Sequence, residues 1–213
     1  MNTDELARML ATGAEAIDQR APVQRCALAV GAGVIAATVL MATWLGVRSN
    51  LIQDFGSPML WTKFAFVAWL AVGGWVAARR LARPGARLAR VPGALAAPVL
   101  AMWLLAAYVL LSATAGEREA LIFGGTWDAC PLFVALLSAP VFAAAMWAMK
   151  GLAPTRLAMA GAAAGLLAGS VGALIYALHC SEMDAPFLAI WYLLGMLIPT
   201  AVGAVTGPWL LRW

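Results

Sequence analysis

The stretch PGALAAPVLAMWLLAAYVLLSA at residues 92–113 is 22 residues long and carries no charged side chain. An α-helix rises about 1.5 Å per residue, so a run of this length can cross the roughly 30 Å hydrocarbon core of a bilayer. Five further apolar runs of similar length occur along the chain. The six transmembrane helices that we predict cover residues of about 26–47, 58–78, 92–113, 129–149, 157–178 and 186–211.

The composition of the whole chain agrees with a membrane protein. Of its 213 residues, 64% are hydrophobic and only 11% are charged, whereas a soluble domain has just under half apolar and about a quarter charged residues. A soluble domain of this length could not bury so much apolar surface, and the same figures exclude a disordered chain. The runs lack the alternation of barrel strands. We therefore predict an all-α integral membrane bundle of six transmembrane helices.

The basic residues predict the orientation, because Lys and Arg collect in short cytoplasmic loops. If the N-terminus is inside, the inner segments hold eleven of the fourteen basic residues, and Arg48, Lys63 and Arg118 are left for the outer side. We therefore predict an N-in/C-in topology. Lys63 lies within the second span near its outer end, and we expect its long side chain to reach the outer interface.

Acidic residues are absent from the middle of every predicted span, which argues against a proton-coupled transporter. The chain also has no HExxH, no GxSxG and no phosphate-binding glycine loop, so we do not expect an enzyme. The main alternative is a small six-span transporter or channel for a metal ion or a hydrophobic solute. It would need polar groups at mid-depth, where the spans offer little beyond Thr43, Ser138, Ser170 and Thr200. A scaffold subunit without a sensing role is a third interpretation.

The sequence divides into a tail of residues 1–25 and a transmembrane domain of residues 26–213. Helical periodicity in the tail puts apolar side chains on one face. A helix this short is marginal in water. We therefore expect the tail helix to become ordered by binding to a surface, either that of a partner protein, of the membrane or of the bundle itself. The candidate partner-binding residues are Leu6, Met9, Leu10 and Ile17.

Two cysteines form the second candidate site. Cys130 stands where the fourth span begins and Cys180 where the fifth ends, so the topology puts both at the same outer surface. An oxidising outer compartment permits a disulfide. The two thiols, with His179, Asp128 and Glu182 as helpers, could instead hold a soft metal ion, although their spacing is no metal signature. A purely structural disulfide or two unrelated buried thiols are equally open.

Two other features have a packing interpretation. Cys26, at the inner end of the first span, is expected to be a small packing residue. Gly161, Gly165 and Gly169 repeat every four residues in the fifth span, a stripe that lets a neighbouring helix approach closely.

Together these motifs resemble the NrsF family. The resemblance extends over almost the full length of the chain, and its most specific element is the pairing of Cys130-Pro131 with His179-Cys180. The other matching elements are Thr3-Asp4-Glu5-Leu6, an Arg-Pro-Gly turn after the second span, Trp127 to Asp128, Ala153-Pro154-Thr155-Arg156, Tyr176-Ala177-Leu178 and Trp191-Tyr192.

The resemblance implies a function for both candidate sites. Members of the family are bacterial inner-membrane anti-sigma factors that restrain a sigma-F-type extracytoplasmic-function (ECF) sigma factor. The cytoplasmic tail would hold the sigma factor at the lipid bilayer, without direct contact to nucleic acid. Cys130 and Cys180 would release it under heavy-metal or oxidative stress. No cofactor is expected beyond a transient heavy-metal ion at these two cysteines.

Overall fold

The computed structural model describes residues 2–12, 21–83, 85 and 88–212, and within these residues the chain is helical and has no strand. In chain order the helices are α1 (Thr3–Thr12), α2 (Ala21–Trp44), α3 (Leu51–Asp54), α4 (Pro58–Leu81), α5 (Val91–Ser112), α6 (Ala115–Phe123), α7 (Cys130–Lys150), α8 (Leu157–Tyr176), α9 (Ala185–Phe187), the π-helix η1 (Leu188–Tyr192) and α10 (Leu193–Leu210).

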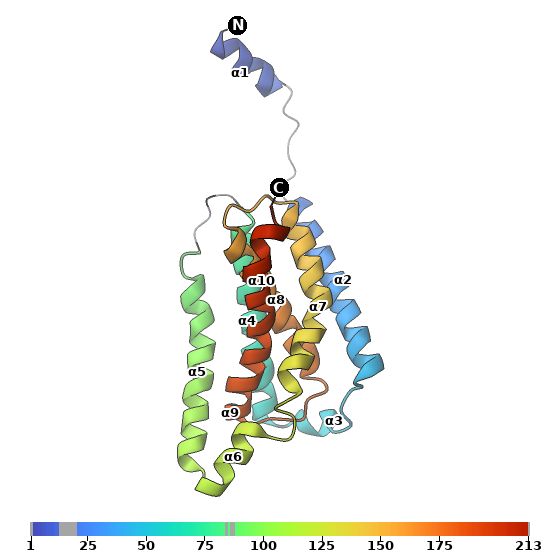
Figure 1. Ribbon diagram of the computed structural model, residues 1–213, viewed down its shortest axis with the longest axis vertical. Helices are drawn as coiled ribbons and strands as arrows, with labels where there is room; N and C mark the ends of the chain where they lie inside the picture. The colour runs from blue at the N-terminus through green and yellow to red at the C-terminus, as the bar shows by residue number, and fades with distance from the viewer. Residues whose placement is uncertain (1, 13–20, 84, 86–87, 213) are drawn as a thin grey trace.

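Six helical stretches in the described residues are long and apolar enough to cross a membrane. The predicted all-α fold with six candidate membrane-spanning helices is confirmed. They are α2, α4, α5, α7, α8 and the continuous run from α9 to α10. The helix of the first span, α2, begins at Ala21, before the predicted start at residue 26. Proline is well accommodated in a first helical turn, so Pro22 does not prevent this earlier start. α2 begins and α10 ends at one end of the bundle, which we call the terminal end (Figure 1).

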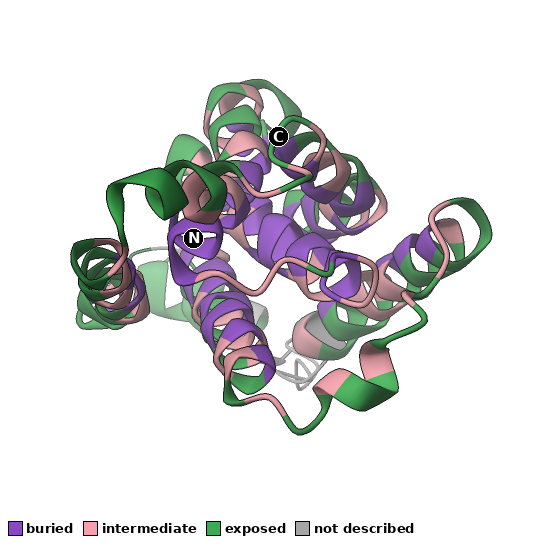
Figure 2. Cartoon of the chain, turned by 90° about the horizontal axis from the view of Figure 1, so that it is seen from below, coloured by how far each residue is buried: buried purple, intermediate pink, exposed green. Residues whose placement is uncertain are grey.

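α8 lies at the centre of the bundle. Two-thirds of its apolar stretch is buried, 67% against 11% for the peripheral α5. Figure 2 shows buried residues facing the middle of the bundle and exposed residues on its outside. Such an outside is the arrangement expected when lipid surrounds the helices.

The glycine stripe of α8 allows this central position. A Cβ atom on Gly161 would overlap the carbonyl of Gly203 in α10, and one on Gly165 would overlap the carbonyl of Pro199. The two helices therefore meet backbone to backbone, as small residues permit in membrane helices. The packing role predicted for the stripe is confirmed.

The last span does not begin as a regular α-helix. A short α9 leads into the π-helix η1, and α10 follows without a break. A π-turn inserts an extra residue into the helical register, and such turns are frequent at functional sites. Here it carries Tyr192, whose side chain is completely buried in the core.

Candidate functional site

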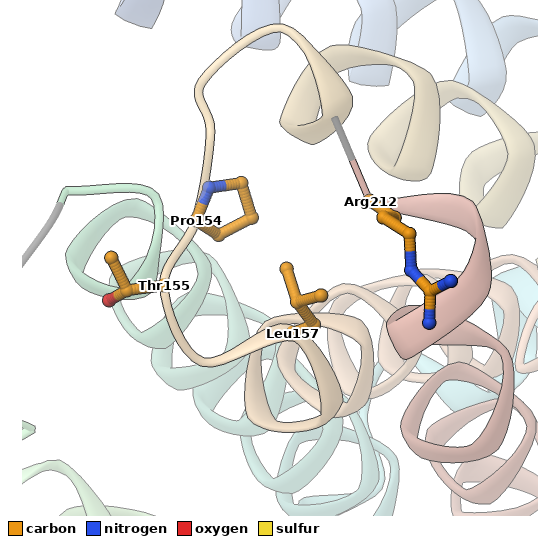
Figure 3. Close-up of a pocket in the computed structure, with 4 residues that line it drawn as sticks. All are labelled: Pro154, Thr155, Leu157 and Arg212. Carbon is orange, nitrogen blue, oxygen red and sulfur yellow. The ribbon is translucent and has the colours of Figure 1, made fainter.

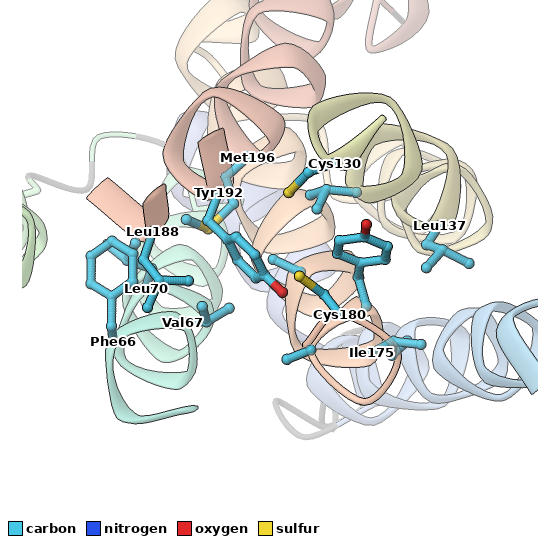
Figure 4. Close-up of a cluster of buried hydrophobic side chains, with 14 of the residues drawn as sticks. Phe66, Val67, Leu70, Cys130, Leu137, Ile175, Cys180, Leu188, Tyr192 and Met196 are labelled. Carbon is cyan, nitrogen blue, oxygen red and sulfur yellow. The ribbon is translucent and has the colours of Figure 1, made fainter. Parts of the chain in front are cut away.

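The two cysteines that are far apart in the sequence lie in one buried cluster (Figure 4). It is at the end of the bundle where α7 begins and α8 ends, opposite to the terminal end (Figure 1). We call this the cysteine end. Cys130 is the first residue of α7, and Cys180 lies in the segment between α8 and α9. Both are free thiols. The predicted placement at one end of the bundle agrees with the structure, but the thiols are not at the surface: Cys130 is 0% and Cys180 3% exposed.

Local hydrogen bonds place each thiol. The Cys130 amide donates to the Thr126 carbonyl at 2.9 Å, so the turn before α7 already has helical spacing, and Pro131 suits the second position of the helix. After α8, the amides of His179 and Cys180 both donate to the Tyr176 carbonyl at 2.9 Å. This shared bond ends α8 in a tight turn, and Cys180, which closes the turn, is buried.

A buried lysine holds the Cys180 segment from the side of α4. Lys63 Nζ donates to the main-chain carbonyls of Cys180 and Glu182, both at 3.0 Å, and lies 4.6 Å from the centroid of the Tyr192 ring. Lys63 is 0% exposed, so the expectation that it reaches the outer interface is wrong. The non-helical carbonyls and the aromatic face give the ammonium group inward partners.

Arg48 is a second cation on the same segment and was missed as a site residue. It follows α2, and its Nη1 donates to the Cys180 carbonyl at 3.2 Å. The same nitrogen lies 3.4 Å from a carboxylate oxygen of Asp54, and the Arg48 side chain is only 6% exposed. The only signals in the sequence were a lysine inside a span and an arginine on the outer side, and neither indicates a direction for the side chain.

Two of the three predicted helper residues bond to other partners, and the third is exposed. His179 Nδ1 lies 2.9 Å from the Gly46 carbonyl, which can only accept, so this nitrogen carries the proton. The Glu182 carboxylate accepts from the Gly125 amide at 2.9 Å, and Asp128 is exposed. Across the residues that the structure describes, no three His, Cys, Asp or Glu side chains are grouped to hold a metal ion.

The surroundings of Cys180 lower the pKa of its thiol. The hydrogen bond from the Cys130 thiol is the largest influence that lowers the pKa of Cys180, and the charge of Lys63 adds to it. Burial opposes both but does not outweigh them. The thiolate is the form that binds soft metals and attacks oxidants, so this environment favours such chemistry at Cys180.

α6 and the turn that follows it are hydrogen-bonded to residues between Cys180 and the end of η1. Besides the bond from Gly125 to Glu182, Trp191 Nε1 donates to the Ile122 carbonyl at 2.8 Å. The Trp127 and Trp191 rings pack with centroids 5.2 Å apart. These contacts join the elements that carry the two cysteines on the outer side of the site.

A change of Lys63 to Met is expected to raise the rate at which a maleimide labels Cys180 by about tenfold. The variant has an unbranched side chain of similar length and lacks the donors to two carbonyls; a loss of about 1.4 kcal/mol of hydrogen bonding corresponds to a tenfold larger open population. The buried thiol is labelled in this open state, where it is away from residue 63 and has the same intrinsic reactivity in both proteins, so the loss of the Lys63 charge does not slow the labelling. Labelling of each cysteine can be measured by mass spectrometry, with the exposed Lys150→Met as control. Equal rates in the wild type and Lys63→Met would contradict this role of Lys63.

The terminal end of the bundle has a shallow pocket of about 290 Å³ (Figure 3). Pro154, Thr155, Leu157 and Arg212 line it. This lining offers one charged side chain and no thiol, imidazole or carboxylate. These four described residues therefore offer none of the groups that sensing chemistry would need.

The predicted partner-binding residues are placed in part. Leu6 and Met9 lie on α1 and are 40% and 57% exposed. Leu10 is also in α1, but its side chain is outside the described residues, as is the whole of Ile17. α1 thus presents part of the predicted apolar face.

Comparison with known proteins identifies the family. The family model described as "Negative regulator of sigma F" matches residues 10–213. The chain belongs to the NrsF family. This NrsF-family chain is 53% identical to the probable anti-sigma-F factor NrsF of Azospira oryzae over 213 residues, and 38% identical to the anti-sigma-F factor NrsF of Caulobacter vibrioides over 218 aligned residues. Both alignments cover the full length of both chains. No solved structure matches it.

Proposed function

We propose that this NrsF-family chain is an inner-membrane anti-sigma factor that sequesters an ECF sigma factor through its cytoplasmic N-terminal tail. It releases the sigma factor when Cys130 and Cys180 react with a heavy-metal ion or an oxidant. The observation that carries the proposal is the meeting of these two thiols at one end of a six-helix bundle whose full-length relatives bear the name anti-sigma-F factor.

The tail is the proposed binding element. The excess of basic residues favours an N-in/C-in orientation, which puts the tail in the bacterial cytoplasm, where a sigma factor is present. The exposed Leu6 and Met9 give α1 an apolar face, and an amphipathic helix of this kind binds by laying that face into a groove of its partner. The bound tail would cover surface that RNA polymerase needs.

Either sensing reaction would draw the two cysteines together. A soft metal ion would bind both sulfurs. Alternatively, the two thiols give up two protons and two electrons to an oxidant and form one S–S bond. In both cases Cys180 becomes tied to the start of α7. To change the ratio of the released state to the sigma-bound state from 1:99 to 99:1, the reaction must favour the released state by about 5.5 kcal/mol.

The alternative of a transporter or channel has less support. Three of the four hydroxyl groups that a mid-depth route would need bond to carbonyls of their own helices instead: Thr43 to Val39, Ser138 to Ala135 and Thr200 to Met196. Hydroxyl groups that bond to carbonyls of their own helix in this way are not directed at a polar route through the bundle.

Binding of a sigma-F-type ECF sigma factor to the full chain in lipid nanodiscs tests the proposal. We expect saturable binding that falls at least about tenfold when Cd²⁺ or the oxidant diamide is added, because the differential affinity of the two states sets the response. Empty nanodiscs and an unrelated sigma factor serve as controls. An inserted chain that does not bind the sigma factor would contradict the proposed function.

A further inference from the structure

The Cys180 segment is hydrogen-bonded to the residues that follow α2. Residues 178–180 and residues 46–48 are joined by three hydrogen bonds, and we call this contact the α2 junction. The Arg48 amide donates to the Leu178 carbonyl at 3.2 Å, His179 Nδ1 to the Gly46 carbonyl at 2.9 Å, and Arg48 Nη1 to the Cys180 carbonyl at 3.2 Å.

The α2 junction is attached directly to the end of the helix. The amides of Leu45 and Gly46 both donate to the Met41 carbonyl at 2.9 Å, and Gly46 has a φ of 75°. This left-handed glycine closes the helix, as is common at helix C-termini. His179 therefore bonds the capping residue of α2, and a displacement of His179 acts on the helix end without a flexible linker between them.

α2 is also the helix on which both sensing elements and the tail converge. It packs mainly against α7, whose first residue is Cys130, and the segment that carries Cys180 is bonded to its far end. Gly33 lies against the backbone of α7, since a Cβ there would be 2.8 Å from Val141 Cα. Near the start of α2, the Arg25 guanidinium lies 4.5 Å from the centroid of the Trp147 ring of α7. The tail is the sequence that precedes α2.

From this arrangement we infer that the α2 junction couples the cysteine pair to the tail, with Arg48 and His179 as its positioning residues. The inference rests on the proposed function and names the route by which the sensing site would act on the binding site. When Cys180 is drawn towards Cys130, residues 178–180 move with it. The bonds of Leu178 to the Arg48 amide and of His179 to Gly46 then carry the end of α2 along α7. A helix transmits such a shift to its other end as a rigid body.

Arg48 offers the α2 junction a second arrangement besides the one in the structure. In the structure its Nε and Nη2 atoms are buried and make no hydrogen bond, which is unfavourable for a cation. Its carboxylate neighbour Asp54 is 36% exposed. Arg48 Nη1 already lies 3.4 Å from Asp54. If the Cys180 carbonyl is withdrawn, the guanidinium can turn outward around this contact, so that Nε and Nη2 reach the carboxylate and water. A two-state element of this kind is what coupling between distant sites requires.

Variants of Arg48 and His179 in the full chain test the inference. Arg48→Met removes the guanidinium, and His179→Phe keeps a ring beside Tyr176 but removes the bond to Gly46. Both variants should bind the sigma factor at rest within twofold of the wild type, and diamide should still oxidise their Cys130–Cys180 pair. Diamide-induced release should fall by about fivefold or more, within the usual range of coupling between sites. Arg118→Met, an exposed arginine of α6, is the matched control.

The outcomes separate the inference from the proposed function. Release at the wild-type level from both variants would overturn the coupling role of the α2 junction. Loss of sigma binding before oxidation in both variants would also overturn it, because the contact would then serve the resting fold and not transmission. If the Arg48→Met variant does not insert into the membrane, the release measured for the His179→Phe variant decides the test by itself. Failure of the proposed function would appear instead in the wild type, as no binding or as release that does not depend on the cysteines.

Discussion

A chain that lacks residues 2–20 is expected to insert into the membrane normally and to lose its affinity for the sigma factor by about a hundredfold or more. All six stretches that can span the membrane begin at or after Val23, so the deletion leaves them intact. It removes α1 and with it the apolar face formed in part by Leu6 and Met9. A few anchor residues commonly supply most of the free energy of such an interface, so little affinity should remain.

Binding to nanodiscs, together with a protease-protection assay for topology, measures both effects of the deletion. Two substitutions in the full chain refine the result. Leu6→Ala should weaken binding by about tenfold, since a buried leucine at an interface contributes on the order of 1.5 kcal/mol or more. Asp4→Ala, on the other face of the helix, should stay within twofold. If the deleted chain still binds the sigma factor, the inner loops or the C-terminus must make the contact.

Replacement of both Cys130 and Cys180 by Ser is expected to leave sigma binding intact and to abolish release by Cd²⁺ or diamide. The hydroxyl of Ser neither forms a disulfide nor binds soft metals as a thiolate does, whereas its size preserves the packing around these buried positions. Each single variant should also fail to respond to diamide, because one S–S bond needs both sulfurs.

The third cysteine provides a matched control. Cys26 is also a buried free thiol, but it lies in α2 near the terminal end, outside the cluster of the other two. Cys26→Ser should therefore respond like the wild type. Release that is still normal in the Cys130→Ser/Cys180→Ser double variant would remove the two cysteines from the sensing mechanism.

The six spans could be predicted from the sequence because membrane insertion depends on local properties. Length and apolarity of each run decide whether it can cross the bilayer, and neither requires knowledge of its neighbours. The glycine stripe of α8 was predictable for a similar reason: a helical face that is small at Gly161 and Gly165 indicates close packing whichever helix meets it. The helix that it meets, α10, was not predictable.

The candidate site was predictable only as a pair of residues. The topology placed Cys130 and Cys180 at the same end of the bundle, but their burial beneath the surface depends on how α7 packs beside α8 and α10. Two residues that were expected to help the cysteines because they are near them in sequence have other partners: His179 is bonded to Gly46 and the Glu182 carboxylate to Gly125. Nearness along the chain does not determine the direction of a side chain in a turn.

By itself, the sequence determined that this protein is a helical membrane bundle with a polar tail and two cysteines at one end, because hydropathy and charge act residue by residue. The tertiary structure alone decided that Lys63 and Arg48 turn inward to the Cys180 carbonyl. A cation in an apolar span must find a partner, and it can reach outwards to water or inwards to polar backbone. The choice depends on whether another segment presents unbonded carbonyls within reach, and only the folded chain brings residues 180 and 182 beside α4.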